Sequence, residues 1–210
     1  MKTVNAAILA ISFVTGSAHA TDFSFAGNFT NDNQVQEFNF AVTGLATDVT
    51  LRTWSYAGGT NAAGDGIARG GFDPIVSLFN ASTGEYIAAN DDGGSNVTTD
   101  TNGVPYDSFL RDHLAAGNYT ATLTQFGSFA NGPLLTDGFR GSGQQTNFGS
   151  RDSHWAFDIL NVESASVGAS YISAIPEPES YALLLAGLGL VGFMVRRRDK
   201  LPIQDFATAA

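Results

Sequence analysis

Oxygen-bearing side chains gather in this sequence at positions where the chain is expected to turn between strands. Asp73 precedes an apolar run, Asn90, Asp91 and Asp92 follow the next one, and Asp107 comes further on. If the two runs form a hairpin, the residues before the first and after the second meet at one end. Ca²⁺ prefers about six to eight oxygen ligands from carboxylates, amides, carbonyls and water. These five residues therefore form a predicted Ca²⁺ site.

The same residues also fit a simpler interpretation. Asn and Asp cap turns and Gly accepts positive φ, so the run from Asn90 to Gly94 is ordinary turn chemistry as well. It is not an EF-hand, because the twelfth position counted from Asp91 is Asn102 instead of Glu. A cation site and a plain turn both remain open at this point.

Catalytic motifs are weak. Asp152, Ser153 and His154 are adjacent, and neighbours on a strand point to opposite faces, so they cannot form a triad. No Gly-x-Ser-x-Gly elbow is present, and the absence of Cys excludes thiolate chemistry. We expect no enzyme activity; a secreted hydrolase whose site matches no familiar motif is an alternative.

Charge excludes one class of partner. The 210 residues carry a net charge of −10, and the segment 21–175 holds 16 acidic residues against five arginines and no lysine. Nucleic-acid binding needs Lys or Arg to replace counterions, so no nucleic-acid partner is expected. An acidic middle segment fits an extracellular protein and attracts divalent cations.

Alternating apolar and polar residues predict an all-β domain. The alternation is rich in aromatic and β-branched residues and is broken by Gly, Asn and Asp turns, which favours a jelly-roll-like β-sandwich. Trp54, Tyr56, Phe126 and Trp155 could stack on sugar rings if exposed, although core packing is the commoner role. The expected strands are 22–29, 35–43, 48–56, 75–80, 86–89, 118–126 and 154–162. The domain is expected to cover 21–162, with a Ser- and Ala-rich linker over 163–175.

The first twenty residues read as a secretory signal peptide. Lys2 precedes a short apolar run, and Ala18 and Ala20 form the small-x-small pattern that signal peptidase cuts, which places the cut before Thr21. The protein is therefore expected to leave the cytoplasm.

The other end combines a proline-rich motif, an apolar run and a basic cluster. Residues 181–195 are uncharged and almost wholly apolar, which predicts a short transmembrane helix in the inner membrane. The basic residues that follow belong on the cytoplasmic side, with 199–210 as a cytoplasmic tail. An ordinary C-terminal anchor is the alternative. The motif over 176–198 consists of Pro176, Glu177, Pro178 and, after the apolar run, Arg196, Arg197 and Arg198.

This order resembles the PEP-CTERM sorting signal of Gram-negative bacteria. The resemblance implies that exosortase, a membrane protease, cuts the signal after transient anchoring and leaves the protein at the cell surface or outside the cell. It also implies association with exopolysaccharide and biofilm, because exosortase systems accompany exopolysaccharide production. The tail after Arg198 is longer than the family's usual ending.

Residues 72–125 carry a second resemblance. Asp73-Pro74, two apolar strands around a Gly turn and Asn90-Asp91-Asp92-Gly93 are similar to the pre-peptidase C-terminal β-sandwich domains of secreted bacterial proteins. In those relatives the module binds or assists and does not catalyse. The sequence thus predicts a non-catalytic surface or extracellular-matrix protein that associates with polysaccharide, or alternatively a carbohydrate-binding accessory module.

Overall fold

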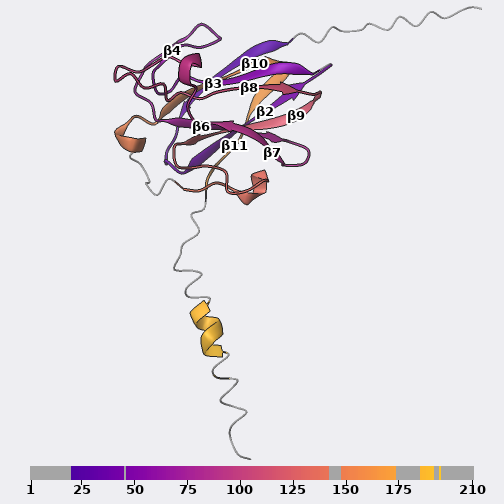
Figure 1. Ribbon diagram of the computed structural model, residues 1–210, viewed down its shortest axis with the longest axis vertical. Helices are drawn as coiled ribbons and strands as arrows, with labels where there is room; N and C mark the ends of the chain where they lie inside the picture. Colours follow the sequence, from indigo (N-terminus) through magenta and orange to yellow (C-terminus); the bar gives the residue numbers. More distant parts are fainter. Residues whose placement is uncertain (1–19, 45, 142–147, 174–184, 192–193, 195–210) are drawn as a thin grey trace, which may run out of the picture. The chain divides into compact units, whose positions relative to one another are not determined.

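The chain folds into two compact units, Met1–Ser173 and Ala174–Ala210. The computed structural model describes residues 20–44, 46–141, 148–173, 185–191 and 194 (Figure 1). The second unit contributes a helix at residues 185–191. Within the described ranges, no helix has both the length and the apolar character needed to cross a membrane. The transmembrane helix over 181–195 therefore stays a prediction.

Two antiparallel sheets make up the first unit (Figure 1). One sheet has the order β1 (Thr21–Asn28), β10 (His154–Val162), β3 (Thr47–Thr53) and β8 (Phe109–Leu114). The other has the order β11 (Ser164–Ile172), β2 (Gln34–Val42), β9 (Gly117–Gln125), β6 (Pro74–Asn80) and β7 (Tyr86–Asn90). A two-stranded ribbon, β4 (Gly59–Thr60) with β5 (Gly66–Ile67), and short 3₁₀ turns at Gly94–Asn96, Leu135–Asp137 and Phe148–Ser150 complete the described elements.

The strand order supports the predicted jelly-roll outline. With the short ribbon set aside, β1, β3, β8 and β10 lie in one sheet, and β2, β6, β7 and β9 lie in the other. Most connections therefore cross from sheet to sheet, as the Greek keys of a jelly roll require. β11 is an additional strand that pairs with the free edge of β2.

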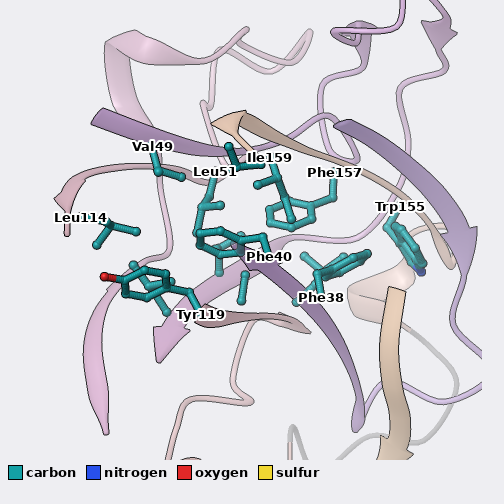
Figure 2. Packing of buried hydrophobic residues seen from close by; sticks show 14 of the residues in the cluster. Phe38, Phe40, Val49, Leu51, Leu114, Tyr119, Trp155, Phe157 and Ile159 are labelled. Atoms are coloured by element: carbon teal, nitrogen blue, oxygen red, sulfur yellow. The ribbon is translucent and has the colours of Figure 1, made fainter. Parts of the chain in front are cut away.

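The core lies between the two sheets (Figure 2). On β2, Phe38 and Phe40 are buried while Asn39 between them is exposed, which is the period expected of a strand with one face inward. Phe38 meets Phe157 of β10 at a ring-centroid distance of 4.7 Å. Burying one such ring contributes about 1.5–3 kcal/mol, so this contact helps to hold the two sheets together.

A smaller apolar cluster lies on the outer face of the five-stranded sheet. It joins Val35 of β2 and Phe79 of β6 to Phe139, which belongs to the connection between β9 and β10. We call residues 126–140 of this connection the covering loop. Because Phe139 is 1% exposed, the covering loop is packed against the sheet and fixed in place.

The domain boundary predicted at residue 162 is wrong. Strand β11 occupies most of the expected linker 163–175, and the Ser173 backbone N–H then donates to the Asn33 carbonyl oxygen at 3.0 Å. The buried Ser173 hydroxyl also donates to the Phe139 carbonyl oxygen. Residues 21–173 thus contain both sheets and both apolar clusters, and they belong to one compact unit.

Candidate cation-binding site

The hairpin of β6 and β7 brings three aspartates together. Asp73 directly precedes β6, and Asp91 and Asp92 directly follow β7. The two strands are antiparallel, with Val76 opposite Asn90, so the start of β6 lies beside the end of β7. One carboxylate oxygen from each aspartate lies within 4.8 Å of the others. These three side chains are the acidic cluster considered below.

Two oxygens of the acidic cluster lack a hydrogen bond. Asp73 Oδ1 and Asp91 Oδ1 are both buried, and neither has a partner in the described part of the chain. Burial, with the charges of Asp91, Asp92 and Asp107 added, raises the pKa of the Asp73 carboxyl to about 8. Burial and the Asp92 charge raise the pKa of Asp91 to about 6. A bound cation would satisfy both oxygens and favour the ionised carboxylates.

Asn90 uses its amide to hold the backbone beside the acidic cluster. Its Oδ1 accepts a hydrogen bond from the Phe109 N–H at 2.7 Å, and its Nδ2 donates to the Asp92 carbonyl oxygen at 3.2 Å. The amide therefore joins the end of β7 to the start of β8. It positions the cluster, and its oxygen is not oriented as a ligand.

Asp107 is also occupied elsewhere. Its carboxylate accepts hydrogen bonds from the Thr53 hydroxyl at 2.9 Å and from the backbone N–H groups of Tyr56 at 3.1 Å and Ala57 at 2.8 Å. The side chain is 1% exposed. Asp107 thus holds the chain that leaves β3, and it acts on Asp73 only through its charge.

Ser108 supports the cluster and was not singled out from the sequence. Its buried hydroxyl lies 2.7 Å from the Pro74 carbonyl oxygen and 3.0 Å from that of Asp91, so it connects the two ends of the hairpin. Gly93 passes so close to this region that an added Cβ would lie 2.8 Å from the Asp107 carbonyl oxygen. An Asp-Ser pair before a strand is not a distinctive signal, so Ser108 could not be identified from the sequence.

The arrangement fits part of a calcium site. Three carboxylates supply hard oxygen ligands, and the exposed Asp92 leaves one side open to water, which can complete the coordination. The chemistry that this arrangement can perform is to bind a cation whose charge balances the half-buried carboxylates.

The aromatic residues considered as sugar platforms separate into two groups. Trp155 and Tyr56 are buried in the domain, and Trp54 is stacked under the Arg52 guanidinium at 3.7 Å from the ring centroid. Phe126, at the start of the covering loop, is 52% exposed. Core or structural packing is therefore the observed role of the first three, and Phe126 remains available at the surface.

His154 contacts Asp152, and within the described residues its ring nitrogens bind no serine or threonine hydroxyl. Its Nδ1 lies 3.5 Å from Asp152 Oδ1, and its Nε2 lies 3.0 Å from the Ala68 carbonyl oxygen. Both ring nitrogens of His154 thus face groups that orient the ring. This geometry fits a structural pair.

Comparison with protein families identifies the C-terminal segment. The model described as the PEP-CTERM protein-sorting motif matches residues 174–198. Six residues predicted from the sequence fall in this range, and all lie outside the described residues: Pro176, Glu177, Pro178, Arg196, Arg197 and Arg198. Among curated proteins, no match was found for the chain.

At the other end of the chain, Ala18 of the predicted signal-peptidase site also lies outside the described residues. β1 begins at Thr21, directly after the predicted cut.

Proposed function

For a chain that carries a PEP-CTERM sorting motif, we propose a non-catalytic role at the cell surface or in the extracellular matrix, in association with exopolysaccharide. The motif indicates export, transient membrane anchoring and processing by exosortase. The observation that supports the proposal most is the junction at Ser173. The motif match begins at residue 174, directly after Ser173, which the domain holds by hydrogen bonds.

This junction has a simple consequence for processing. Only Ala174 and Ile175 separate Ser173 from Pro176, and an extended chain spans at most about 3.6 Å per residue. A cut beside the Pro-Glu-Pro motif would therefore lie within a few residues of Ser173, and the product would carry the domain close to the surface to which it is attached.

We also propose that the acidic cluster binds Ca²⁺. Support comes from the two buried carboxylate oxygens without partners and from the raised pKa of Asp73, both of which a cation would relieve. The ligands are Asp73, Asp91 and Asp92, while Asn90 and Asp107 hold the surrounding backbone. The resemblance of 72–125 to pre-peptidase C-terminal domains suits this binding or accessory role.

Fractionation in two strains tests the proposed destination. The chain is expressed in a Gram-negative host with an active exosortase and in the same host with that protease gene deleted. We expect the processed chain in the surface and matrix fractions of the first strain and the uncut precursor in the inner membrane of the second. A periplasmic protein with a signal peptide but no sorting motif serves as the control. An identical distribution in both strains would contradict the proposal.

A further inference from the structure

The covering loop forms a pocket with the hairpin of β6 and β7. The Tyr86 N–H donates to the Pro133 carbonyl oxygen at 2.7 Å, and the Leu135 N–H donates to the Gly84 carbonyl oxygen at 2.8 Å. These bonds and the buried Phe139 hold the loop beside β7. The pocket is open to solvent, and none of its lining residues belongs to the acidic cluster.

The pocket has the size and lining of a small-molecule site. Its volume is about 350 Å³, within the usual range for ligand pockets. Ser77 of β6 and Ala89 of β7 pair with each other at its base. Tyr86, Phe129 and Arg140 line it together with Asn131. A few polar groups thus stand among apolar ones, which is the pattern that orients a ligand.

Aromatic rings are held at the pocket by neighbouring rings. Tyr86 is 42% exposed, and its ring meets the buried Phe79 edge-on at 5.8 Å between centroids. Phe129 meets the exposed Phe126 at 6.0 Å in the same manner. These contacts position the exposed Tyr86 and the half-buried Phe129, so their rings lose little conformational entropy on binding. Aromatic ring faces also suit the C–H face of a sugar ring.

Arg140 places a positive charge at this pocket in an otherwise acidic domain. Its guanidinium carbon lies 5.8 Å from the Phe129 ring centroid. Arg69, Arg111 and Arg151 each pair with a carboxylate, whereas Arg140 forms no ion pair with any carboxylate that the structure describes. A guanidinium fork matches a carboxylate in charge and in bidentate geometry.

We propose that this pocket binds a carboxylate-bearing sugar unit of an acidic polysaccharide. Arg140 takes the carboxylate, Tyr86 and Phe129 contact the ring, and Asn131 offers hydrogen bonds to hydroxyl groups. The inference rests on the proposed association with exopolysaccharide and names the ligand class and the site. The net charge of −11 over 21–175 repels anionic polymers in general, so binding of an acidic sugar here depends on the local positive charge of Arg140.

Calorimetry on residues 21–173 tests the proposal with short oligogalacturonates and with neutral galactose oligomers of the same length. We expect the acidic oligomers to bind and the neutral ones to bind at least about tenfold more weakly, since a charge-assisted hydrogen bond is lost. Arg140→Gln should lower the affinity for the acidic oligomers by about tenfold or more. Tyr86→Ala should lower it by about three- to tenfold.

One variant and one change of buffer serve as controls. Arg111→Gln removes an exposed arginine that pairs with Asp48 on another part of the surface, and it should leave the affinity unchanged. Adding a chelator removes any calcium bridge between the acidic cluster and the oligouronate, so unchanged binding in chelator shows that such a bridge does not carry the affinity. Equal binding of neutral and acidic oligomers, no binding at all, or an equal loss in Arg140→Gln and Arg111→Gln would overturn the proposal. Because this assay uses purified domain, its failure would leave the fractionation result intact.

Discussion

Calcium is expected to raise the melting temperature of the domain 21–173 by about 5–10 °C when present at about 100 times its Kd. At that ratio, binding stabilises the folded state by about 2.7 kcal/mol. For a domain of this size, each kcal/mol shifts the melting temperature by about 2–4 °C. Thermal unfolding followed by circular dichroism, with Ca²⁺ and with chelator, measures the difference.

Ionisation of the acidic cluster is the physical reason for this effect. Without a cation, Asp73 has a folded-state pKa of about 8, well above its ordinary value near 4. The folded state therefore binds more protons than the unfolded state over this range, and stability falls as the pH rises from about 4 to about 8. Calcium should offset this loss, so its stabilising effect should be larger above the Asp91 pKa of about 6 than below it.

The effect of Asp73→Asn on the melting temperature is expected to differ between chelator and Ca²⁺. In chelator at about pH 8, the variant should unfold at a higher temperature than the native domain, because a half-buried charge is removed. With Ca²⁺ added, the variant should show almost no further shift. Asp65→Asn, at an exposed aspartate, should behave as the native domain does. Identical native curves with Ca²⁺ and with chelator, together with no heat of Ca²⁺ binding, would show that the run 90–94 is only a turn.

Replacing Asp107 by Ala is expected to destabilise the domain by about 3 kcal/mol or more, a decrease of about 10 °C in melting temperature. The substitution leaves the buried N–H of Tyr56 and the partly buried N–H of Ala57 without this acceptor. The loss should be the same with Ca²⁺ and with chelator, because Asp107 supports the backbone and is not a ligand.

The matched control for Asp107 is Asp65→Ala, which removes a carboxylate of the same size from an exposed turn and should change the melting temperature little. A variant Asp107→Ala that kept the stability of the metal-free domain and lost only the Ca²⁺ increment would contradict this assignment. It would make Asp107 a ligand, as the sequence alone had allowed.

Most strands could be predicted from the sequence, including the edge strands β1 and β7, whereas the edge strands β8 and β11 could not. The aromatic alternation of β2, β9 and β10 matches their positions to within about two residues, the usual precision of such boundaries. β8 carries Arg111, Asp112 and His113 at a sheet edge, and β11 is rich in Ser, Ala and Gly with few buried side chains. Without a buried face, neither has the periodicity that identifies a strand. This is why β11 was predicted to be a linker.

The candidate site could be predicted as far as local pairing reaches. Asp73, Asp91 and Asp92 belong to one hairpin, so the pattern of strand and turn is enough to bring them together. Asn90 and Asp107 have the right chemistry, but their partners Phe109, Thr53, Tyr56 and Ala57 come from contacts between distant segments. The pocket at Arg140 depends on how the covering loop folds back onto the sheet, and periodicity carries no information on that.

Processing at both ends is the central claim, and mass spectrometry of the mature protein from cell-surface and medium fractions tests it most directly. We predict an N-terminus at Thr21 and a C-terminus near Pro176–Pro178, with no peptide from 181–195 in either fraction. The folded domain up to Ser173 should be intact in both fractions. Surface material that still contains 181–195 would contradict removal of the sorting signal, and a chain that still begins at Met1 would contradict cleavage at Ala20.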